Sequence, residues 1–426
     1  MGLSVIIVGG GIAGLAAAIA LRKDDRKITI LEQSPISTEI GATISLQPNA
    51  SRIVEQQWGL ASALNERGSM VDQAFEVFSL DGELQMRIPL FTTEKYGAER
   101  MMYHRADLHA VLKQRATGDG FPGKPAELKT SSRVVNCDPE KGTVELADGQ
   151  VLSADLIVGA DGIKSAIRRN VLGEEVTAQP TGFSAYRMMI PTEHLEQEAD
   201  FTKVIDPRKG CTTMVMGSDR RLIMGPARNG TIYSIVALVP DENMNEDPTK
   251  TSWTTKGDHD KMMATFADFP SWAQKPLQLA KTSASESGLG LWQLRDLDSL
   301  PTWYRGRAIL IGDAAHAMLP TQGQGASQAI EDAEALGAFF EGADEESSQS
   351  ANTLETVERL NKAIFRCRYD RACTIQAYSR QAAKPATEPG NHKVNMNPAE
   401  FMDYNCNYAG AIDWMRRQEP SMSDAI

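Results

Sequence analysis

The sequence predicts an α/β protein in which a domain built on a parallel sheet is interrupted by a second domain built on an antiparallel sheet. Short apolar, largely β-branched runs have the composition of buried parallel strands, at residues 4–8, 27–31, 155–160 and 307–311. Between residues 172 and 287, strand-like segments follow one another without strong helices, which favours an antiparallel sheet. The parallel domain is therefore split along the chain.

Size, charge and cysteine content narrow the class of protein. The chain has 426 residues, which corresponds to two or three domains at about 150 residues each. Its 44 Lys and Arg against 56 Asp and Glu give a net charge of −12, which disfavours nucleic acid and anionic membranes as partners. The five cysteines are odd in number and show no C-x-x-C spacing. We expect a cytoplasmic, metal-free protein that is a monomer or a homodimer.

The N-terminal segment reads as a βαβ unit. Its first 21 residues carry no charge, but they lack a basic start and are interrupted by glycines, which disfavours a signal peptide or a membrane span. Residues 4–8 are the first strand, the Ala- and Leu-rich residues 13–22 the first helix, and residues 27–31 the second strand.

The next elements alternate between the two expected domains. Residues 47–59 and 105–115 have helical patterns, with Pro48 in the first turn of the former. The runs 75–79 and 85–88 flank Asp81-Gly82 and indicate a hairpin. Residues 133–135 and 143–146, with a turn at Asp148-Gly149, indicate a small meander before the strand at 155–160.

The second half of the chain holds the antiparallel domain and a helical end. We expect strands at 186–190, 222–224 and 231–239, a polar loop at 241–260 and a helix at 261–279. After the strand at 307–311 we expect a helix over 328–340, a solvated loop over 341–350 and a long helix over 353–383. The tail is polar and irregular apart from an aromatic cluster of Tyr404, Tyr408 and Trp414.

Domain boundaries follow from these elements. The parallel domain takes residues 1–75, 98–171 and 288–345. Residues 76–97 form a hairpin on the side of the second domain, which itself takes residues 172–287. A C-terminal helical segment and tail take residues 346–426.

A glycine-rich turn between the first strand and the first helix predicts a dinucleotide site. In Gly9-x-Gly11-x-x-Gly14, the first glycine allows the tight turn, the second lets a pyrophosphate approach, and the third lets the helix pack on the strand. The helix N-terminus supplies N–H donors. Glu32 ends the second strand, where a carboxylate accepts the hydroxyls of an adenosine ribose and repels a 2′-phosphate. The site therefore suits FAD or NAD rather than NADP.

Two further turns favour FAD. Asp161-Gly162 follows the strand at 155–160 and precedes a helix start, and Asp161 either binds the cofactor or only caps that helix. Asp313 ends the strand at 307–311, where a carboxylate binds the ribityl hydroxyls of a flavin. The start of the helix that follows can offer N–H groups to the flavin ring. The candidate cofactor-binding residues of this turn are Pro320, Gly323, Gly325 and Ala326.

Together these motifs resemble the three fingerprints of the single-component aromatic hydroxylases that use FAD. The resemblance includes Arg105-x-Asp107-Leu108, whose arginine reaches the FAD pyrophosphate in that family. It also includes a segment that lies by the flavin, containing Gly41, Ala42 and Thr43. Residues 312–333 are most similar to the salicylate-hydroxylase-like branch, to which fungal secondary-metabolite monooxygenases belong. The resemblance implies the aromatic hydroxylase fold, with a Rossmann-like FAD-binding domain.

The resemblance also implies a reaction. NADPH or NADH reduces the FAD, O₂ adds to give a C4a-hydroperoxyflavin, and a phenolic or other electron-rich aromatic small molecule is hydroxylated or oxidatively dearomatised, in natural-product biosynthesis. One alternative is a flavin-dependent epoxidase of an indole or polyene. A rival of another class is a flavin-binding protein without turnover.

Candidate substrate residues lie in the expected antiparallel sheet. Arg187 matches the family segment that faces the flavin, where it would pair with a phenolate or carboxylate, or else it is a structural arginine on a sheet edge. Tyr186 and Tyr233 are further candidates. Close relatives often have a tyrosine where this chain has Gly225, so we expect an enlarged pocket rather than simple salicylate-type chemistry.

Overall fold

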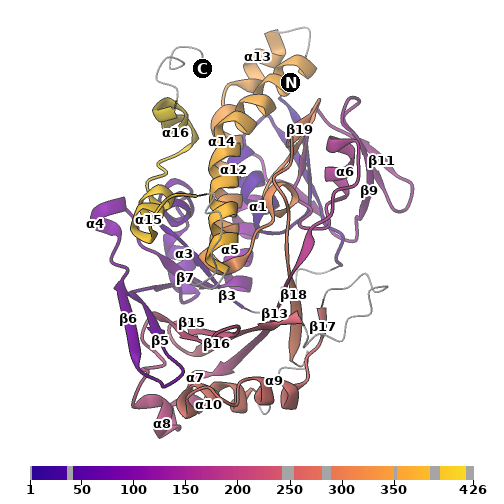
Figure 1. The fold of residues 1–426 in the computed structure, drawn as a ribbon. Helices are drawn as coiled ribbons and strands as arrows, with labels where there is room; N and C mark the ends of the chain where they lie inside the picture. The colour runs from indigo at the N-terminus through magenta and orange to yellow at the C-terminus, as the bar shows by residue number, and fades with distance from the viewer. Residues whose placement is uncertain are drawn as a thin grey trace.

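The computed structural model describes residues 2–35, 42–241, 254–280, 289–349, 353–383 and 394–418. Figure 1 shows a region rich in helices above a broad antiparallel sheet, with a further layer of helices beneath that sheet. The sequence-predicted combination of a parallel-sheet domain with an inserted antiparallel domain is confirmed.

The parallel sheet brings together the four apolar runs. Its order is β19-β20-β12-β1-β2-β8, and all neighbours from β20 to β8 are parallel. Val5 of the central strand pairs with Leu156 on one side and Ile28 on the other, because both faces of these strands are apolar and buried. The strands are β1 (Ser4–Val8), β2 (Lys27–Leu31), β8 (Glu127–Lys129), β12 (Leu156–Gly159), β19 (Tyr304–Arg305) and β20 (Ala308–Leu310).

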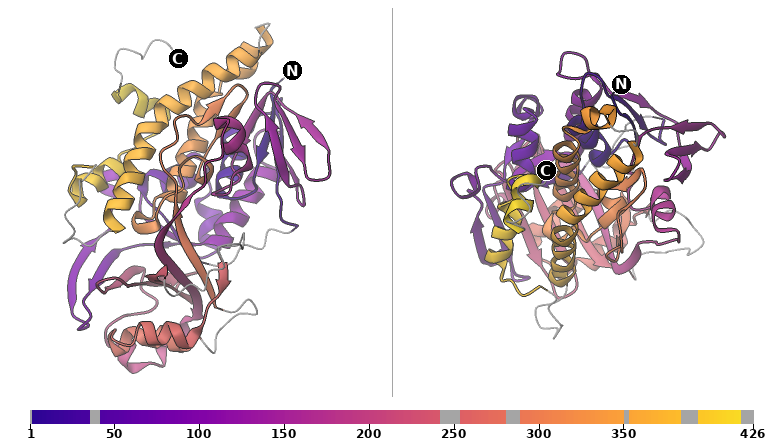
Figure 2. Two further views of the ribbon diagram at one scale, coloured as in Figure 1. Left: turned by 45° about the vertical axis from the view of Figure 1, so that its right-hand side comes forward. Right: turned by 90° about the horizontal axis from the view of Figure 1, so that it is seen from above.

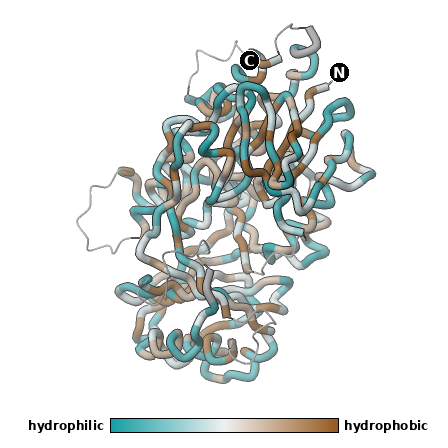
Figure 3. The backbone as a smooth tube through the Cα atoms, turned by 90° about the vertical axis from the view of Figure 1, so that its right-hand side faces the viewer, coloured by the Kyte–Doolittle hydropathy of each residue, from teal (hydrophilic) through white to brown (hydrophobic). Residues whose placement is uncertain are grey.

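Both faces of the parallel sheet are covered. On one face lie α1 (Ile12–Leu21), α5 (Arg105–Thr117) and α12 (Gly325–Phe339), and α14 (Thr353–Ala383) packs outside α12. On the other face are α6 (Ala166–Leu172), α11 (Asp313–His316) and a meander of β9 (Val134–Asp138), β10 (Thr143–Leu146) and β11 (Val151–Ser153). Figure 3 shows the most apolar stretches of chain gathered in the interior of this region.

The antiparallel sheet has eight strands in the order β17-β18-β13-β16-β15-β14-β5-β6. Only the pair β14·β5 is parallel, since the early hairpin of β5 and β6 joins the edge of the sheet from another part of the chain. The strands are β5 (Ala74–Phe78), β6 (Leu84–Pro89), β13 (Gln179–Pro191), β14 (Cys211–Met216), β15 (Arg221–Ala227), β16 (Ile232–Pro240), β17 (Thr254–Lys256) and β18 (Gly290–Asp296).

Strand β18 changes one expected boundary. It pairs with β13 over Gln179↔Asp296 to Arg187↔Gly290, so residues 290–296 belong to the antiparallel sheet rather than to the third part of the parallel domain. The chain had been expected to return to the parallel domain at residue 288. The sequence does not show this difference, because a short apolar strand looks alike in either sheet.

One face of the eight-stranded sheet is covered by short helices, as Figure 2 shows from the side. These are α7 (Thr192–Glu196), α8 (Ala199–Thr202), α9 (His259–Thr265) and α10 (Ser271–Leu279). The single helix expected over 261–279 is broken into α9 and α10, because Pro270 cannot continue a helix and instead precedes the first turn of α10. Asp258 caps α9 through the Lys261 N–H.

Smaller elements connect the two sheets. A three-stranded sheet, β3-β7-β4, consists of β3 (Thr43–Leu46), β4 (Met70–Val71) and β7 (Met101–His104). The helix expected over 47–59 starts as α2 (Pro48–Ser51) and continues as a π-helical turn, Arg52–Gln57. Two further short helices are α3 (Ala61–Glu66) and α4 (Thr93–Tyr96).

Two segments expected to be irregular are helical. The solvated loop expected at 341–350 contains α13 (Ala343–Gln349), and Asp344 is buried there because it accepts the Leu3 N–H at 2.9 Å and pairs with Arg26. The tail contains α15 (Pro398–Cys406), which begins with a capping box of Asn397 and Glu400, and α16 (Ala411–Gln418). Nowhere in the described ranges is a helix both long and apolar enough to cross a bilayer.

Candidate functional site

A cavity of ≈ 1760 Å³ lies between the parallel domain and the eight-stranded sheet. Ligand pockets for drug-sized molecules usually measure about 300–1,000 Å³, so this space is large enough for more than one small molecule. Its upper wall comes from the glycine-rich turns and its lower wall from the sheet face that the short helices do not cover. The site therefore lies where the predicted cofactor residues of the parallel domain meet the predicted substrate residues of the antiparallel sheet.

The first turn has the geometry of a phosphate cradle. Gly9 has φ +107°, and a Cβ there would lie 2.3 Å from the Ala160 carbonyl oxygen. A Cβ on Gly14 would lie 1.9 Å from the Gly9 oxygen, so this glycine lets α1 pack against β1. A Cβ on Gly11 would meet nothing within 4 Å, and Gly11 lines the cavity at the N-terminus of α1. Of the three glycines of this motif, only Gly11 therefore leaves its backbone open to a ligand.

Glu32 supports this turn. One carboxylate oxygen accepts the Gly10 N–H at 2.8 Å, and the other accepts the N–H and the hydroxyl of Ser34 at 2.8 Å each. Glu32 is not among the residues that line the cavity in the described part of the chain. Its role toward a ribose stays a prediction.

The third turn forms the opposite end of the cavity. Asp313 opens α11 after Gly312, whose φ is +57°, and its side chain is open to the cavity. Burial raises the pKa of its carboxyl, and the charges of His316, Arg105 and Arg168 oppose this shift. The residues that follow line the cavity from the 3-10 turn η3 (Pro320–Gln322) and the start of α12, namely Pro320, Gly323, Gly325 and Ala326.

Asp161 caps the start of α6, and its role toward the cofactor stays a prediction. Its carboxylate accepts the Ser165 hydroxyl at 2.5 Å and the Ala166 and Ile167 N–H groups at 2.7 and 3.2 Å. Both oxygens are therefore used to start α6, which is the capping alternative. Its neighbours Ala160 and Gly162 line the cavity, whereas the Asp161 side chain does not.

Arg105, Ala42 and Thr43 line the cavity together. The Arg105 N–H donates to the Ala42 carbonyl at 2.8 Å, so the start of α5 is fixed to the segment before β3. Gly41 lies outside the described residues. His109, one turn further along α5, was not foreseen: its Nε2 lies 2.8 Å from the Gly10 carbonyl oxygen and links α5 to the first turn.

These residues fit FAD. The cavity offers an open helix N-terminus for the pyrophosphate, a cationic side chain at Arg105 and a carboxylate at Asp313 for hydroxyl groups. At the glycine turn, Gly11 leaves the space that a phosphate needs, where any other residue would place a Cβ.

Comparison with known proteins decides the family. The model of the FAD binding domain family matches residues 2–343. The chain belongs to the FAD-dependent monooxygenases of the salicylate hydroxylase type. It is 34% identical to hispidin-3-hydroxylase of Neonothopanus nambi, over 84% of this chain and 85% of the relative. It is 32% identical to salicylate hydroxylase of Pseudomonas putida, over 89% and 85%. A salicylate hydroxylase substrate complex superposes with a TM-score of 0.72 at 27% identity, covering 100% of this chain and 96% of that one.

The monooxygenase is thus an FAD enzyme, and NADH or NADPH is the usual electron donor in its family. The resemblance drawn from the three sequence motifs is confirmed by the family match and by the relatives. Within the described ranges, no group of three or more His, Cys, Asp or Glu side chains is placed to hold a metal ion.

Arg187 is a cation on the sheet side of the monooxygenase cavity, as is Arg221 of β15, which donates to the carbonyl oxygens of Ala382 and Ala383 at 3.3 and 3.2 Å. It lies on β13 and lines the cavity, and its guanidinium carbon is 5.5 Å from the centre of the Trp292 ring. Burial lowers the pKa of Arg187, and the charge of Arg105 lowers it further. Arginine nevertheless stays charged near neutral pH. Within the described part of the chain, no carboxylate pairs with Arg187, whose pKa is shifted only by burial and by Arg105.

The two candidate tyrosines face the other way. Tyr186 is fully buried beside Gly257, and Tyr233 is fully buried in edge contact with Phe201, on the side of the sheet covered by α7 to α10. Neighbouring residues of a strand point to opposite faces, so Tyr186 cannot share a face with Arg187. We no longer assign either tyrosine to the substrate site. Gly225, by contrast, lines the cavity.

A buried ionic network lies behind the third turn and was not foreseen. Glu331 lies on α12, and its carboxylate accepts hydrogen bonds from two arginines of α14, Arg368 and Arg371, the latter at 2.8 Å. It also accepts one from Asn49 at 2.6 Å. The adjacent Asp332 accepts from His316 at 2.6 Å, from Arg368 at 3.0 Å and from the Gly312 N–H at 2.9 Å. Although burial opposes it, the charges of His316 and Arg368 lower the pKa of Asp332 to about 2. The network therefore fixes the end of β20 and the start of α12, which carry the third turn.

Replacing Arg105 by Ala is expected to weaken FAD retention. A hydrogen bond to a charged group contributes about 1.5–3 kcal/mol, so we expect the FAD dissociation constant to rise roughly tenfold to a hundredfold. The measurement is a titration of apoprotein with FAD. Arg133→Ala removes an exposed arginine and serves as the control. Full flavin occupancy of the Arg105 variant after purification would contradict the assignment.

Proposed function

We propose that this monooxygenase hydroxylates, or oxidatively dearomatises, a phenol or other electron-rich aromatic molecule of natural-product biosynthesis, held as an anion by Arg187. The observation that carries the proposal is a cationic side chain in the cavity wall without a carboxylate partner among the described residues. Burying a charge without a partner is costly, and an anionic ligand would remove that cost. A relative named hispidin-3-hydroxylase and a salicylate hydroxylase support an aromatic substrate.

The residues of the chain have separate tasks in this reaction. Two electrons come from NADH or NADPH, one oxygen atom of O₂ enters the ring, and the other leaves as water. When bound, FAD supplies the redox chemistry. Arg187 holds the phenolate form, whose ring is more electron-rich than that of the neutral phenol. The cavity walls around Arg187 would orient the ring and limit access of water to it.

Removal of the Arg187 charge tests the proposal. We expect Arg187→Ala to retain FAD and to lose product formation roughly tenfold to a hundredfold, because a hydrogen bond to a charged group contributes about 1.5–3 kcal/mol. Arg187→Lys keeps the positive charge but not the planar set of donors of the guanidinium group. Its rate of product formation should therefore lie between that of the wild-type enzyme and that of Arg187→Ala.

The assay follows NADH and NADPH oxidation with a panel of phenols, carboxylated phenols and indoles, and identifies products by mass. One compound that speeds oxidation and gains a single oxygen would support the proposal. Unchanged product formation by Arg187→Ala would contradict the role of Arg187. Oxygen on an isolated double bond, rather than on the ring, would indicate epoxidation instead.

A further inference from the structure

A row of cavity residues crosses the eight-stranded sheet from Arg187 to the outer edge. In register, Arg187 pairs with Val236, Val236 with Ile223, and Ile223 with Met214. Met214 then pairs with Val77, and Val77 with Met86 on the edge strand β6. Five steps between strands of about 4.8 Å make the row about 24 Å long. Of its six members, all but Val77 line the cavity.

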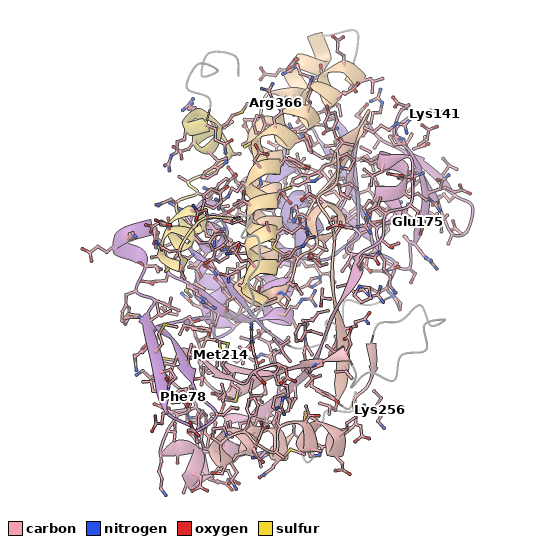
Figure 4. All side chains as sticks on the ribbon, viewed as in Figure 1. Phe78, Lys141, Glu175, Met214, Lys256 and Arg366 are labelled. Atoms are coloured by element: carbon pink, nitrogen blue, oxygen red, sulfur yellow. The ribbon has the colours of Figure 1, made fainter. Side chains whose placement is uncertain are left out.

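Beyond Arg187 this row has no charged side chain. Val236, Ile223, Met214 and Met86 are all apolar, and Phe75 and Ile88 line the cavity beside the outer end. Figure 4 labels Met214 where the sheet faces the region above it, and Phe78 among the side chains nearer the short helices. Methionine side chains adapt to apolar ligands of irregular shape, since they are unbranched and polarisable.

The outer end of the row is open. Met86 is 48% exposed and Met216, which also lines the cavity there, is 43% exposed. Large apolar side chains exposed together commonly mark a ligand or partner site. Here they continue the wall of the cavity that begins at Arg187. A ligand that starts at Arg187 and extends outward to these methionines would contact both the inner and the outer end of the row.

Gly225 lies in the cavity wall beside the row. A Cβ at Gly225 would lie 3.2 Å from the Cys211 carbonyl oxygen and 3.9 Å from the sulfur of Met102. Because Gly225 is two residues from Ile223 on β15, a large side chain at this position would stand beside the row and narrow it. Without that side chain, β15 adds only backbone to this part of the cavity wall.

We infer that the substrate is amphiphilic: an acidic aromatic head at Arg187 that carries a long hydrocarbon arm lying along Val236, Ile223, Met214 and Met86. This inference rests on the proposed function and adds the class of substrate. Burial of the arm stabilises the complex through the hydrophobic effect, with roughly three- to fourfold tighter binding for each methylene that is fully buried.

The test uses the FAD-loaded enzyme and three resorcinols that carry a methyl, pentyl or pentadecyl chain meta to both hydroxyls. Dissociation constants are read from the change in the visible spectrum of the bound flavin, and oxidation from NADH or NADPH consumption. We expect the pentyl compound to bind at least roughly tenfold more tightly than the methyl compound, and the pentadecyl compound more tightly still.

Two variants localise the arm. Met214→Gln should abolish the gain from methyl to pentyl, while Met86→Gln at the edge should reduce only the further gain from pentyl to pentadecyl. Met70→Gln changes the same residue type on β4, outside the cavity lining, and should leave the series unchanged.

The outcomes separate the two proposals. If the methyl compound is bound and oxidised but longer chains bind no better, the arm inference is wrong and the proposed function stands. A gain with chain length that neither Met214→Gln nor Met86→Gln alters would also overturn it, since the arm would then lie elsewhere. If no resorcinol of any length binds or is oxidised, the arm inference is wrong, and the panel of phenols, carboxylated phenols and indoles decides the proposed function.

Discussion

Glu331→Gln is expected to destabilise the FAD-loaded protein by about 3–5 kcal/mol. Glu331 is fully buried and pairs with Arg368 and Arg371, which are themselves fully buried. Burial raises the pKa of Glu331, but the two arginines outweigh it and lower the pKa, so the carboxylate is charged. The amide keeps the shape and removes the charge, which leaves two guanidinium groups in the interior with Asp332 as their remaining buried anion.

The measurement is equilibrium unfolding in urea, followed by flavin fluorescence and by circular dichroism. Glu83→Gln, on the exposed turn between β5 and β6, is the control and should change stability by no more than about 0.5 kcal/mol. A loss of less than about 1 kcal/mol in Glu331→Gln would show that the network contributes little to stability. Because Asn49 and Gln328 also bond to Glu331, we expect weaker FAD retention in the variant as well.

The network shows which contacts lie beyond sequence reasoning. Glu331 and Asp332 were visible as part of a motif, but their partners Arg368 and Arg371 are 36 to 40 residues away on another helix. No local pattern distinguishes these arginines from the solvated cations common on a long helix. Likewise Asp344 lies in an acidic stretch whose composition is typical of an exposed loop. Its partner Arg26 is 318 residues earlier in the chain, so no local pattern indicates the pair.

The glycine turns were predicted because their chemistry is local. Each needs a strand, a turn and a helix start within a few residues, and that arrangement is written in consecutive positions of the chain. The direction in which a strand side chain points is harder to predict from the sequence. Arg187 and Tyr186 are neighbours on one strand, so at most one of them could face the cavity, and only the pairing of Arg187 with Val236 shows which. Tyr233 is three residues from Val236 and therefore faces away, as the structure shows.

Substitutions at Gly14 and Gly11 of the first turn should separate folding from cofactor binding. Gly14→Ala would place a methyl group 1.9 Å from the Gly9 carbonyl oxygen, a backbone atom that cannot turn aside. Helix α1 must then shift from β1, which costs about 1–3 kcal/mol or more and distorts the cradle. We expect this variant to be less stable and to purify without FAD.

Gly11→Ala adds the same methyl group where nothing lies within 4 Å. Its φ of −76° suits alanine, so the apoprotein should unfold at nearly the wild-type urea concentration. FAD should nevertheless bind roughly tenfold more weakly or worse, because the methyl group fills the space where the pyrophosphate approaches the start of α1. The comparison needs apoprotein unfolding and FAD titration for both variants. Wild-type FAD affinity in Gly11→Ala would mean that the pyrophosphate does not pass this residue, and the assignment of the first turn would be wrong.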